Sequence, residues 1–284
     1  MGQFPLVTKH SLQHACHACG SDSLVPIVLC NKKGETKEIL RCNACFHAFS
    51  VGHAPDEGVA SGDYGMIDGV PPKMERDAAL ASYLFYSQLL KPGDTILDFG
   101  AGWGGLSLEI EKLVRAHALG CQQVCVEAFA PMQDYIRRAS QNAIRVEKSL
   151  DALEAGHFDC IICKEVIEHL DEPAVFLSQL RRLAKSGALL FLTSPGNPYR
   201  HVNAMHDYFN YYVKGHVHFF NKQSMIAILR RCGFDSIHFT YIDDFYPEHA
   251  TSKDFQEKVE RTLKGIGQRF AADPWHLQVV CSAR

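Results

Sequence analysis

The sequence lacks any apolar stretch of about 18 residues, the length at which a run reads as a transmembrane helix, and residues 1–14 contain no apolar signal core. The N-myristoylation pattern also fails, because residue 6 is a leucine where the pattern requires serine or threonine. We therefore expect no membrane partner and a cytoplasmic location.

An excess of charge of one sign is also missing. The chain has 29 Lys and Arg residues against 32 Asp and Glu residues, which gives a formal net charge of −3. Proteins that capture nucleic acid through charge carry a broad basic surface, so we do not expect nucleic acid as a partner. The apolar content of 46% is ordinary for a globular protein, and 284 residues can hold one α/β domain and a small appendage.

Two common nucleotide-binding motifs are missing. There is no G-x-x-x-x-G-K-[ST] segment, which argues against a P-loop. Glycines occur at positions 100, 102, 104 and 105, so the third glycine of the dinucleotide pattern G-x-G-x-x-G is misplaced.

The most prominent motif that is present is a glycine-rich turn between a predicted strand at residues 95–98 and a helix that begins near Leu106. Such a turn directs backbone N–H groups and the positive end of a helix dipole at a ligand. Its glycines turn the chain sharply and let a ligand approach the backbone closely. On its own the turn fits NAD(P), FAD, nucleotides or S-adenosylmethionine.

An acidic residue, Glu127, ends the next predicted strand and follows Asp98 by 29 positions. In an open α/β sheet this places its carboxylate beside the ligand crevice at the carboxyl ends of the strands. A carboxylate there can accept hydrogen bonds from both hydroxyls of a ribose. The alternative is an exposed acidic residue in a loop.

Four of the eleven cysteines form two C-x-x-C pairs that are separated by 22 residues. This spacing is typical of a structural zinc site, here with the ligands Cys16, Cys19, Cys42 and Cys45. A segment of about 40 residues is too short to form a stable hydrophobic core of its own, and zinc binding would supply the missing stability. The alternatives are two disulfides, which a reducing compartment disfavours, or unrelated thiols. The other cysteines lie mostly in apolar runs and are expected to be small core residues.

The predicted zinc ribbon covers residues 1–50, and its mixture of acidic and basic residues is typical of a solvated hairpin face. Residues 51–72 are rich in Gly, Pro and Asp and are expected to form a linker or a functional lid. Tyr64 within them is either a packing anchor or a side chain that lines the pocket.

From residue 73 onward, helical and strand patterns alternate, which is typical of an α/β domain. Helices are predicted at 73–90, from 106 onward, and at 130–142, 174–185, 222–232 and 251–270. Strands are predicted at 95–98, 123–126, 144–147, 158–163, 188–193, 236–242 and 276–282.

Three blocks of sequence together resemble class I S-adenosylmethionine-dependent methyltransferases. They are ILDFGAGWGG at 96–105, FDCIICKEVIEHLDEP at 158–173 and GALLFLTSPGN at 187–197. The N-terminal cysteine pairs are similar to those of sugar C-methyltransferases and related natural-product enzymes. The resemblance implies a Rossmann-like, mostly parallel sheet of seven strands within a methyltransferase domain at 73–284. It also implies that the last strand inserts antiparallel between the fifth and the sixth.

The resemblance further implies how S-adenosylmethionine would be held. Its methionine part would contact Asp98 and the backbone of Gly100, Ala101 and Gly102, and its ribose would contact Glu127. Its adenine would lie near Ala128, Phe129, Ser149 and Leu150. Lys164 stands where this family usually has a small or polar residue that contacts the cofactor. It could pair with an anionic substrate or with the carboxylate of the cofactor.

Methyl transfer to a hydroxyl or an acidic carbon calls for a base. Residues 199–220 are rich in His and Tyr, and HVHFF at 216–220 resembles a segment of the sugar C-methyltransferases in which a histidine is thought to be the base. By this resemblance His218 is the first candidate and His216 the second, whereas His169 would orient its loop. The alternative is that one of the two packs in the core or caps a helix.

The sequence therefore predicts a zinc ribbon joined to a methyltransferase that acts on a small molecule. The favoured acceptor is a hydroxyl or a carbon of a sugar or a related biosynthetic intermediate, with a nucleotide-linked sugar as one form. One alternative is a methyltransferase-like binding protein, and another is a methyltransferase whose ribbon recruits protein or RNA. No N-P-P-Y motif follows the fourth strand, which argues against the usual adenine and glutamine N-methylators.

Overall fold

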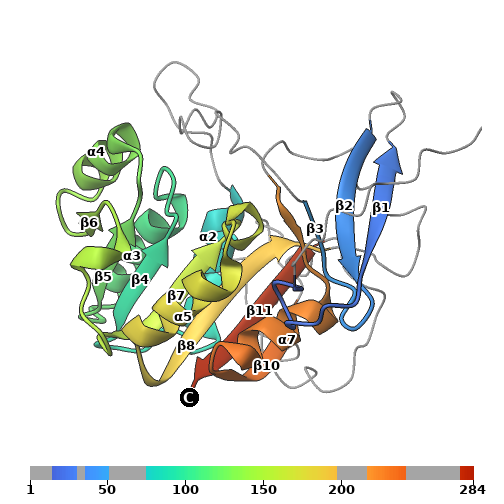
Figure 1. Ribbon diagram of the computed structural model, residues 1–284. Helices are drawn as coiled ribbons and strands as arrows, with labels where there is room; N and C mark the ends of the chain where they lie inside the picture. The colour runs from blue at the N-terminus through green and yellow to red at the C-terminus, as the bar shows by residue number, and fades with distance from the viewer. Residues whose placement is uncertain (1–14, 31–35, 51–74, 197–215, 241–275) are drawn as a thin grey trace, which may run out of the picture.

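The computed structural model describes residues 15–30, 36–50, 75–196, 216–240 and 276–284, which form two sheets (Figure 1). One is a seven-stranded sheet with helices on both faces, and the other is a smaller sheet that contains the N-terminal strands. Tyr64, the linker or lid and the helix predicted at 251–270 lie outside the described residues. Within the described ranges, no helix has the length and apolar character needed to cross a membrane.

The large sheet has the strand order β10-β11-β8-β7-β4-β5-β6. Five strands run parallel: β4 (Thr95–Phe99), β5 (Gln122–Val126), β6 (Arg145–Glu147), β7 (Phe158–Lys164) and β8 (Ala184–Pro195). The strand β11 (His276–Ala283) lies antiparallel between β8 and β10 (Phe234–Thr240). The predicted Rossmann-like sheet and the antiparallel insertion of its last strand are therefore confirmed.

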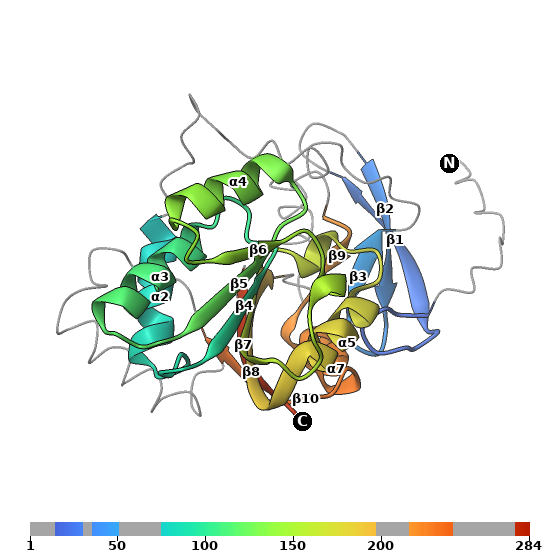
Figure 2. The same cartoon turned by 90° about the vertical axis from the view of Figure 1, so that its left-hand side faces the viewer.

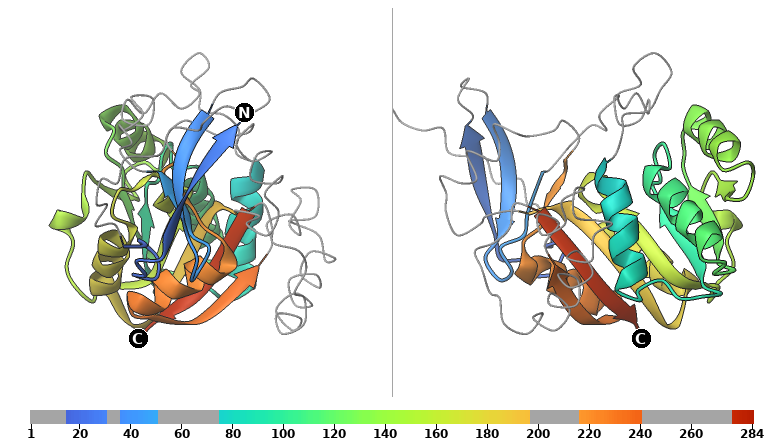
Figure 3. Two further views of the ribbon diagram at one scale, coloured as in Figure 1. Left: turned by 45° about the vertical axis from the view of Figure 1, so that its right-hand side comes forward. Right: turned by 180° about the vertical axis from the view of Figure 1, so that it is seen from behind.

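Helices cover both faces of this sheet, as Figures 1 and 3 show from opposite sides. On one face lie α5 (Pro173–Leu183) and α7 (Lys222–Arg231), and on the other lie α2 (Glu75–Tyr86) and α3 (Gly105–Ala116). Successive strand residues point to opposite faces, so Leu97 joins the first layer and Ile96 the second. Burial on both faces explains why the strands read as continuous apolar runs.

Several predicted helices end earlier than expected. The helix α2, predicted to reach residue 90, ends at Tyr86, and Gln88 beyond it has a left-handed φ of 58°. The helix α4 (Ala130–Ala139) stops because Gln141 and Asn142 adopt left-handed backbone angles, with φ of 55° and 61°. The helix α5 ends at Leu183, and Ala184 already has the extended conformation of β8. Two short 3-10 helices, η1 (Leu150–Ala152) and η2 (Ile167–His169), follow β6 and β7.

The small sheet combines segments from distant parts of the chain. Its order is β1 (Leu24–Cys30), β2 (Thr36–Cys42), β3 (Ala48–Ser50) and β9 (His218–Phe219). The pairing of β3 with β9 is antiparallel, with Phe49 opposite His218, and Figure 2 shows the two strands side by side. A strand that lies between β8 and α7 in the sequence thus completes the sheet of the N-terminal ribbon.

Hydrogen bonds also join the ribbon to both ends of α7. Asn221 caps the helix through the backbone N–H of Ser224 at 3.0 Å and donates its own side-chain amide to the carbonyl of Cys45 at 3.2 Å. Near the other end, Arg231 donates to the carbonyl of Ala18 at 3.2 Å. The two cysteine turns are thereby fixed against one helix of the larger fold.

Candidate active site

A pocket of about 1280 Å³ lies at the carboxyl ends of β4, β5 and β7. Ligands bind at this edge in open α/β sheets. The volume exceeds the roughly 300–1,000 Å³ of a usual single-ligand site, so a cofactor and an acceptor could share it. Nine of the ten predicted cofactor residues line the pocket: Gly100, Ala101, Gly102, Glu127, Ala128, Phe129, Ser149, Leu150 and Lys164.

The glycine-rich turn forms the floor of this pocket. Gly100 has a φ of 71°, and a Cβ added there would lie 2.4 Å from Cγ2 of Val166. Gly102 has a φ of 57° and nothing within 4 Å of the corresponding position, so its open side faces free space. Gly100 is therefore required for packing against the loop after β7, whereas Gly102 leaves room for a ligand.

We expect Gly100→Ala to lower the free energy of unfolding by ~2–4 kcal/mol, because it combines an unfavourable backbone angle with a steric clash. The matched control is Gly156→Ala. Gly156 also has a positive φ, 62°, but no atom lies within 4 Å of the added Cβ. This control should cost only about 1 kcal/mol. Urea unfolding of both variants measures the difference, and equal costs would show that the contact with Val166 is unimportant.

Glu127 is held at the pocket wall by two backbone amides. The N–H of Gly102 donates to its Oε2 at 2.8 Å, and the N–H of Phe129 donates to its Oε1 at 2.9 Å. Each carboxylate oxygen can accept a further hydrogen bond. The carboxylate thus connects the glycine turn to the loop after β5, and it retains acceptor capacity for a ligand.

Asp98 lies behind the turn and is not part of the pocket lining. Its side chain is buried and accepts a hydrogen bond from the hydroxyl of Ser107 at 2.7 Å. Burial, together with the nearby carboxylates of Asp77 and Glu127, raises its pKa to about 6. This placement supports a role in holding α3 against β4, and direct contact with a cofactor stays a prediction.

Lys164 forms an ion pair with Asp77 of α2 at the pocket wall. Asp77 is almost fully buried, while about a third of the Lys164 side chain is exposed. Lys164 could be predicted from its place after the fourth strand, but Asp77 could not, because nothing in a helical pattern indicates that one of its residues meets a strand end 87 positions away. Together the two side chains present one positive and one negative group to the pocket.

Aromatic side chains outside the set of predicted site residues also line the pocket. Trp103 and Tyr135 meet edge to face, with ring centroids 5.7 Å apart, and Phe99 packs on Phe176 at 4.6 Å. Trp103 lies within the glycine-rich turn. That position is the one sequence feature that could have indicated its place in the pocket. Flat apolar surfaces of this kind suit the base of a nucleoside.

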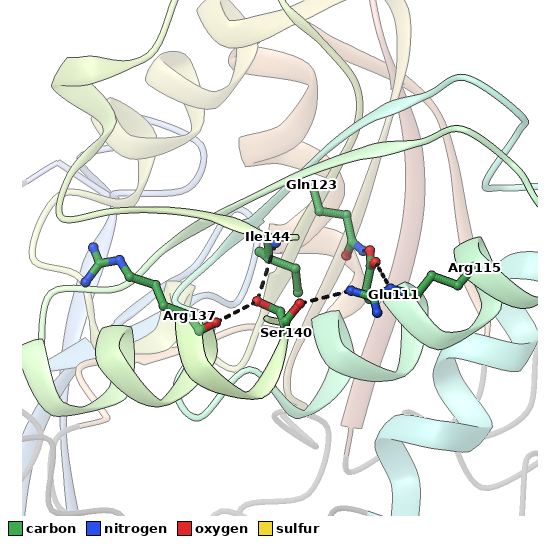
Figure 4. A network of polar contacts seen from close by, with 6 residues as sticks. All are labelled: Glu111, Arg115, Gln123, Arg137, Ser140 and Ile144. Carbon is green, nitrogen blue, oxygen red and sulfur yellow. Dashed lines mark hydrogen bonds and ion pairs between the residues drawn. The ribbon is translucent and has the colours of Figure 1, made fainter. Parts of the chain in front are cut away.

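A polar network fixes the outer edge of the pocket (Figure 4). Arg115 of α3 donates to Glu111 at 2.6 Å and to the backbone carbonyl of Ser140, which follows α4, at 3.0 Å. The amide of Gln123 on β5 donates to the other oxygen of Glu111 at 2.9 Å. The network therefore joins α3 and β5 to the end of α4. The helix α4 carries Tyr135.

The opposite wall is the loop after β7. Glu165 has a φ of 54°, a conformation that is rare outside glycine and that occurs often at functional sites. Its Oε1 accepts a hydrogen bond from the hydroxyl of Thr193 at 2.6 Å. His169 lines the pocket two residues after the start of η2, which places an imidazole at this wall.

His169 belongs to a cluster with Glu168 and His216. One ligating atom from each of the three residues lies within 4.8 Å of the others. The rings of His169 and His216 meet edge to face with centroids 4.7 Å apart. The structure thus places His216, the second candidate base, directly behind the pocket wall.

His218, the first candidate base, is placed elsewhere. Its ring is 1% exposed, and its Nδ1 lies 3.0 Å from Nε2 of His47 in the ribbon. Burial, together with the neighbouring His17, lowers its pKa to about 3. It does not line the pocket, so this placement does not support His218 as a base. The pattern His-x-His suggested equivalent roles, but of the two only His216 packs against His169 at the pocket wall.

The four cysteines of the two C-x-x-C pairs converge as predicted. Their sulfur atoms all lie within 4.8 Å of one another, with Cys16 and Cys45 at 3.5 Å and Cys19 and Cys42 at 3.6 Å. Tetrahedral zinc with Zn–S bonds of about 2.3 Å needs sulfur atoms about 3.8 Å apart. The site therefore fits structural zinc.

Comparison with known protein families supports the same fold. A family model described as a methyltransferase domain matches residues 73–238, which is more than half of the chain. The match excludes the cysteine-rich segment and β11.

Among curated proteins, the ubiquinone biosynthesis O-methyltransferase of Hahella chejuensis is 32% identical over 111 residues. That match covers 36% of this chain and 44% of the relative, and the chain spans less than half the length of the curated relatives it matches.

Two solved structures have a similar fold. Phosphoethanolamine N-methyltransferase 2 of Haemonchus contortus, in complex with phosphomonomethylethanolamine and S-adenosylhomocysteine, has a TM-score of 0.50 at 17% identity, over 72% of this chain and 51% of that one. The CurJ carbon methyltransferase has a TM-score of 0.50 at 15% identity, over 72% of this chain and 54% of that one. At these identities the likeness shows the fold alone.

Proposed function

Because this chain belongs to the methyltransferase family whose model spans residues 73–238, we propose that it transfers a methyl group from S-adenosylmethionine to a small-molecule acceptor. The favoured acceptor is a hydroxyl or a carbon of a sugar or a related biosynthetic intermediate, and a nucleotide-linked sugar is one form of it. The observation that supports this proposal most is the Glu127 carboxylate, which is held beside the glycine turn in a pocket large enough for two ligands.

The polar groups of the pocket match the parts of this cofactor. Glu127 can accept hydrogen bonds from the two ribose hydroxyls, and the backbone from Gly100 to Gly102 lies next to it. Asp77 and Lys164 carry charges opposite to those of the amino and carboxylate groups of a methionine. Apolar surface from Phe129 and Leu150 suits the adenine.

S-adenosylmethionine, when bound, supplies a methyl group on a positively charged sulfur that leaves readily. The protein has to align the acceptor, exclude water and, for a hydroxyl or an acidic carbon, remove a proton from it. Phe99, Val166 and Phe176 line the pocket with apolar surface that limits access of water to a bound acceptor. His169, with His216 behind it, is the imidazole positioned at the same wall.

The proposal also covers the domain boundaries of the chain and the cellular location of the protein. We propose a zinc ribbon at 1–50, a linker or lid at 51–72 and a methyltransferase domain at 73–284. The ribbon is a structural support in this arrangement, because its hydrogen bonds and its sheet pairing join it to α7 and β9. A cytoplasmic location remains part of the proposal, on the basis of the zinc-type cysteine pairs.

Calorimetric titration of the zinc-loaded full chain tests the proposal. S-adenosylmethionine and S-adenosylhomocysteine are expected to bind at about one per chain, while NAD⁺, which shares the adenosine part, is the control and should not bind. Acceptor mixtures can then be incubated with isotope-labelled cofactor and examined by mass spectrometry for labelled products. Absence of cofactor binding by folded protein would contradict the proposal and favour a methyltransferase-like binding protein.

A further inference from the structure

We propose that Glu168, His169 and His216 form a binding site for a divalent cation of the Mn²⁺ type at the wall of the pocket. One carboxylate and two imidazoles are a recurrent ligand set for such ions, and three protein ligands leave open positions for a substrate. The site is distinct from the four cysteines of the ribbon.

The geometry brings the three ligands to one point. The Nε2 atom of His169 lies 3.9 Å from Oε1 of Glu168, and all three ligating atoms fall within 4.8 Å of one another. Metal–ligand bonds of about 2.0–2.2 Å place neighbouring ligand atoms about 3 Å apart. Small rotations of the side chains are therefore enough to place all three on one ion.

The second observation concerns the burial and the hydrogen bonding of the Glu168 carboxylate. The Glu168 side chain is 1% exposed, and within the part of the chain that the structure describes neither carboxylate oxygen has a hydrogen-bond partner of good geometry, although the side chain of Ser194 lies close by. A buried carboxylate without compensation is costly. A cation bound to Glu168 would balance this charge.

The backbone holds the ligands in this arrangement. Glu168 and His169 lie on η2, and the carbonyl of Glu168 accepts a hydrogen bond from the N–H of Val217 at 2.8 Å. This bond fixes His216, the preceding residue, against η2. Val217 in turn precedes β9, which pairs with the ribbon. The site therefore joins two segments that are distant in sequence.

The position of the site carries a consequence for the acceptor, and this part rests on the proposed function. His169 lines the pocket, so the open coordination positions of the ion would face the acceptor. An acceptor with two oxygens on adjacent carbons could bind both of them to the ion. The ion would lower the pKa of a bound hydroxyl, and the proton would be released to water. The preferred acceptors are therefore vicinal diols, including catechols, over isolated hydroxyls.

Electron paramagnetic resonance tests the site with Mn²⁺ as the probe and the zinc-loaded full chain as the protein. Mn²⁺ is a weak competitor for the thiolate site, because it lies at the low end of the affinity series and prefers oxygen and nitrogen ligands. We expect about one saturable Mn²⁺ per chain. Glu168→Gln and His169→Ala should each weaken Mn²⁺ binding by more than about 100-fold. This is a larger loss than usually follows when a residue that only hydrogen-bonds to a metal ligand is replaced.

The matched control is Glu172→Gln, which removes an exposed carboxylate three residues beyond His169 and should leave Mn²⁺ binding unchanged. Binding of S-adenosylhomocysteine, measured on each variant, verifies that the protein is folded. It also separates this proposal from the proposed function, because a variant that binds the cofactor but not Mn²⁺ affects the cation site alone. No saturable Mn²⁺ site, or one that Glu168→Gln leaves unchanged, would overturn the proposal and leave the histidines as candidate bases.

Discussion

Replacing Glu127 with alanine is expected to weaken the binding of S-adenosylhomocysteine by ~2–4 kcal/mol, because two charge-assisted hydrogen bonds to the ribose are lost. This corresponds to roughly 30- to 900-fold in the dissociation constant. The same carboxylate accepts the backbone N–H groups of Gly102 and Phe129. Its removal therefore also frees the turn on which the cofactor would lie. Calorimetric titration measures the change.

Two further variants isolate the cause. Glu127→Gln keeps an oxygen that can accept one of the backbone bonds but loses the charge, so an intermediate loss of affinity is expected. Glu109→Gln removes another carboxylate of the pocket lining, one that is paired with Lys112 at 2.6 Å on the surface of α3. It should leave the affinity unchanged. An alanine variant at position 127 with normal affinity would refute the role of Glu127 at the ribose.

Replacing Cys42 with serine is expected to abolish stable zinc binding and to unfold the ribbon. Purified wild-type protein should contain about one zinc per chain by elemental analysis, and the variant should contain far less. Structural zinc sites contribute roughly 10–16 kcal/mol of apparent binding free energy in small peptides, so even a partial loss exceeds the stability that a ribbon of this size could otherwise have. The melting temperature should fall as a result.

The effect should reach the pocket as well, because the ribbon supports β9 and α7. His216 lies two residues before β9, so its position depends on this support. Cys121→Ser is the matched control. Cys121 is partly buried and outside the ribbon, and it donates to the carbonyl of Lys91 at 3.2 Å, a bond that serine can also form. A metal-free Cys42→Ser protein of unchanged stability would contradict a structural role for zinc.

Most of the large sheet could be predicted from the sequence, because its strands are buried on both faces and therefore appear as uninterrupted apolar runs. The run of residues 160–163 is one example, since all four residues are buried. The glycine turn and Glu127 could be predicted for a related reason. Both stand at the carboxyl ends of neighbouring strands, where the topology of the sheet brings them together.

The parts that could not be predicted depend on contacts between distant residues. Asp77 sits in a helix with no local feature that distinguishes it from a solvated acid, and only the packing of α2 brings it to Lys164. The contact of His47 with His218 spans 171 positions. A local pattern therefore could not show that His218 contacts the ribbon while His216 packs against His169 of the pocket wall.

The pairing of β3 with β9 also has a consequence for the order of events during synthesis. About 170 residues must leave the ribosome after Ser50 before β9 exists, because the strand that pairs with β3 begins at His218. Until then β3 is an edge strand with unpaired backbone groups, which is the kind of surface that recruits other chains into aggregates. A nascent or prematurely terminated chain would therefore carry its metal-binding segment with an open edge.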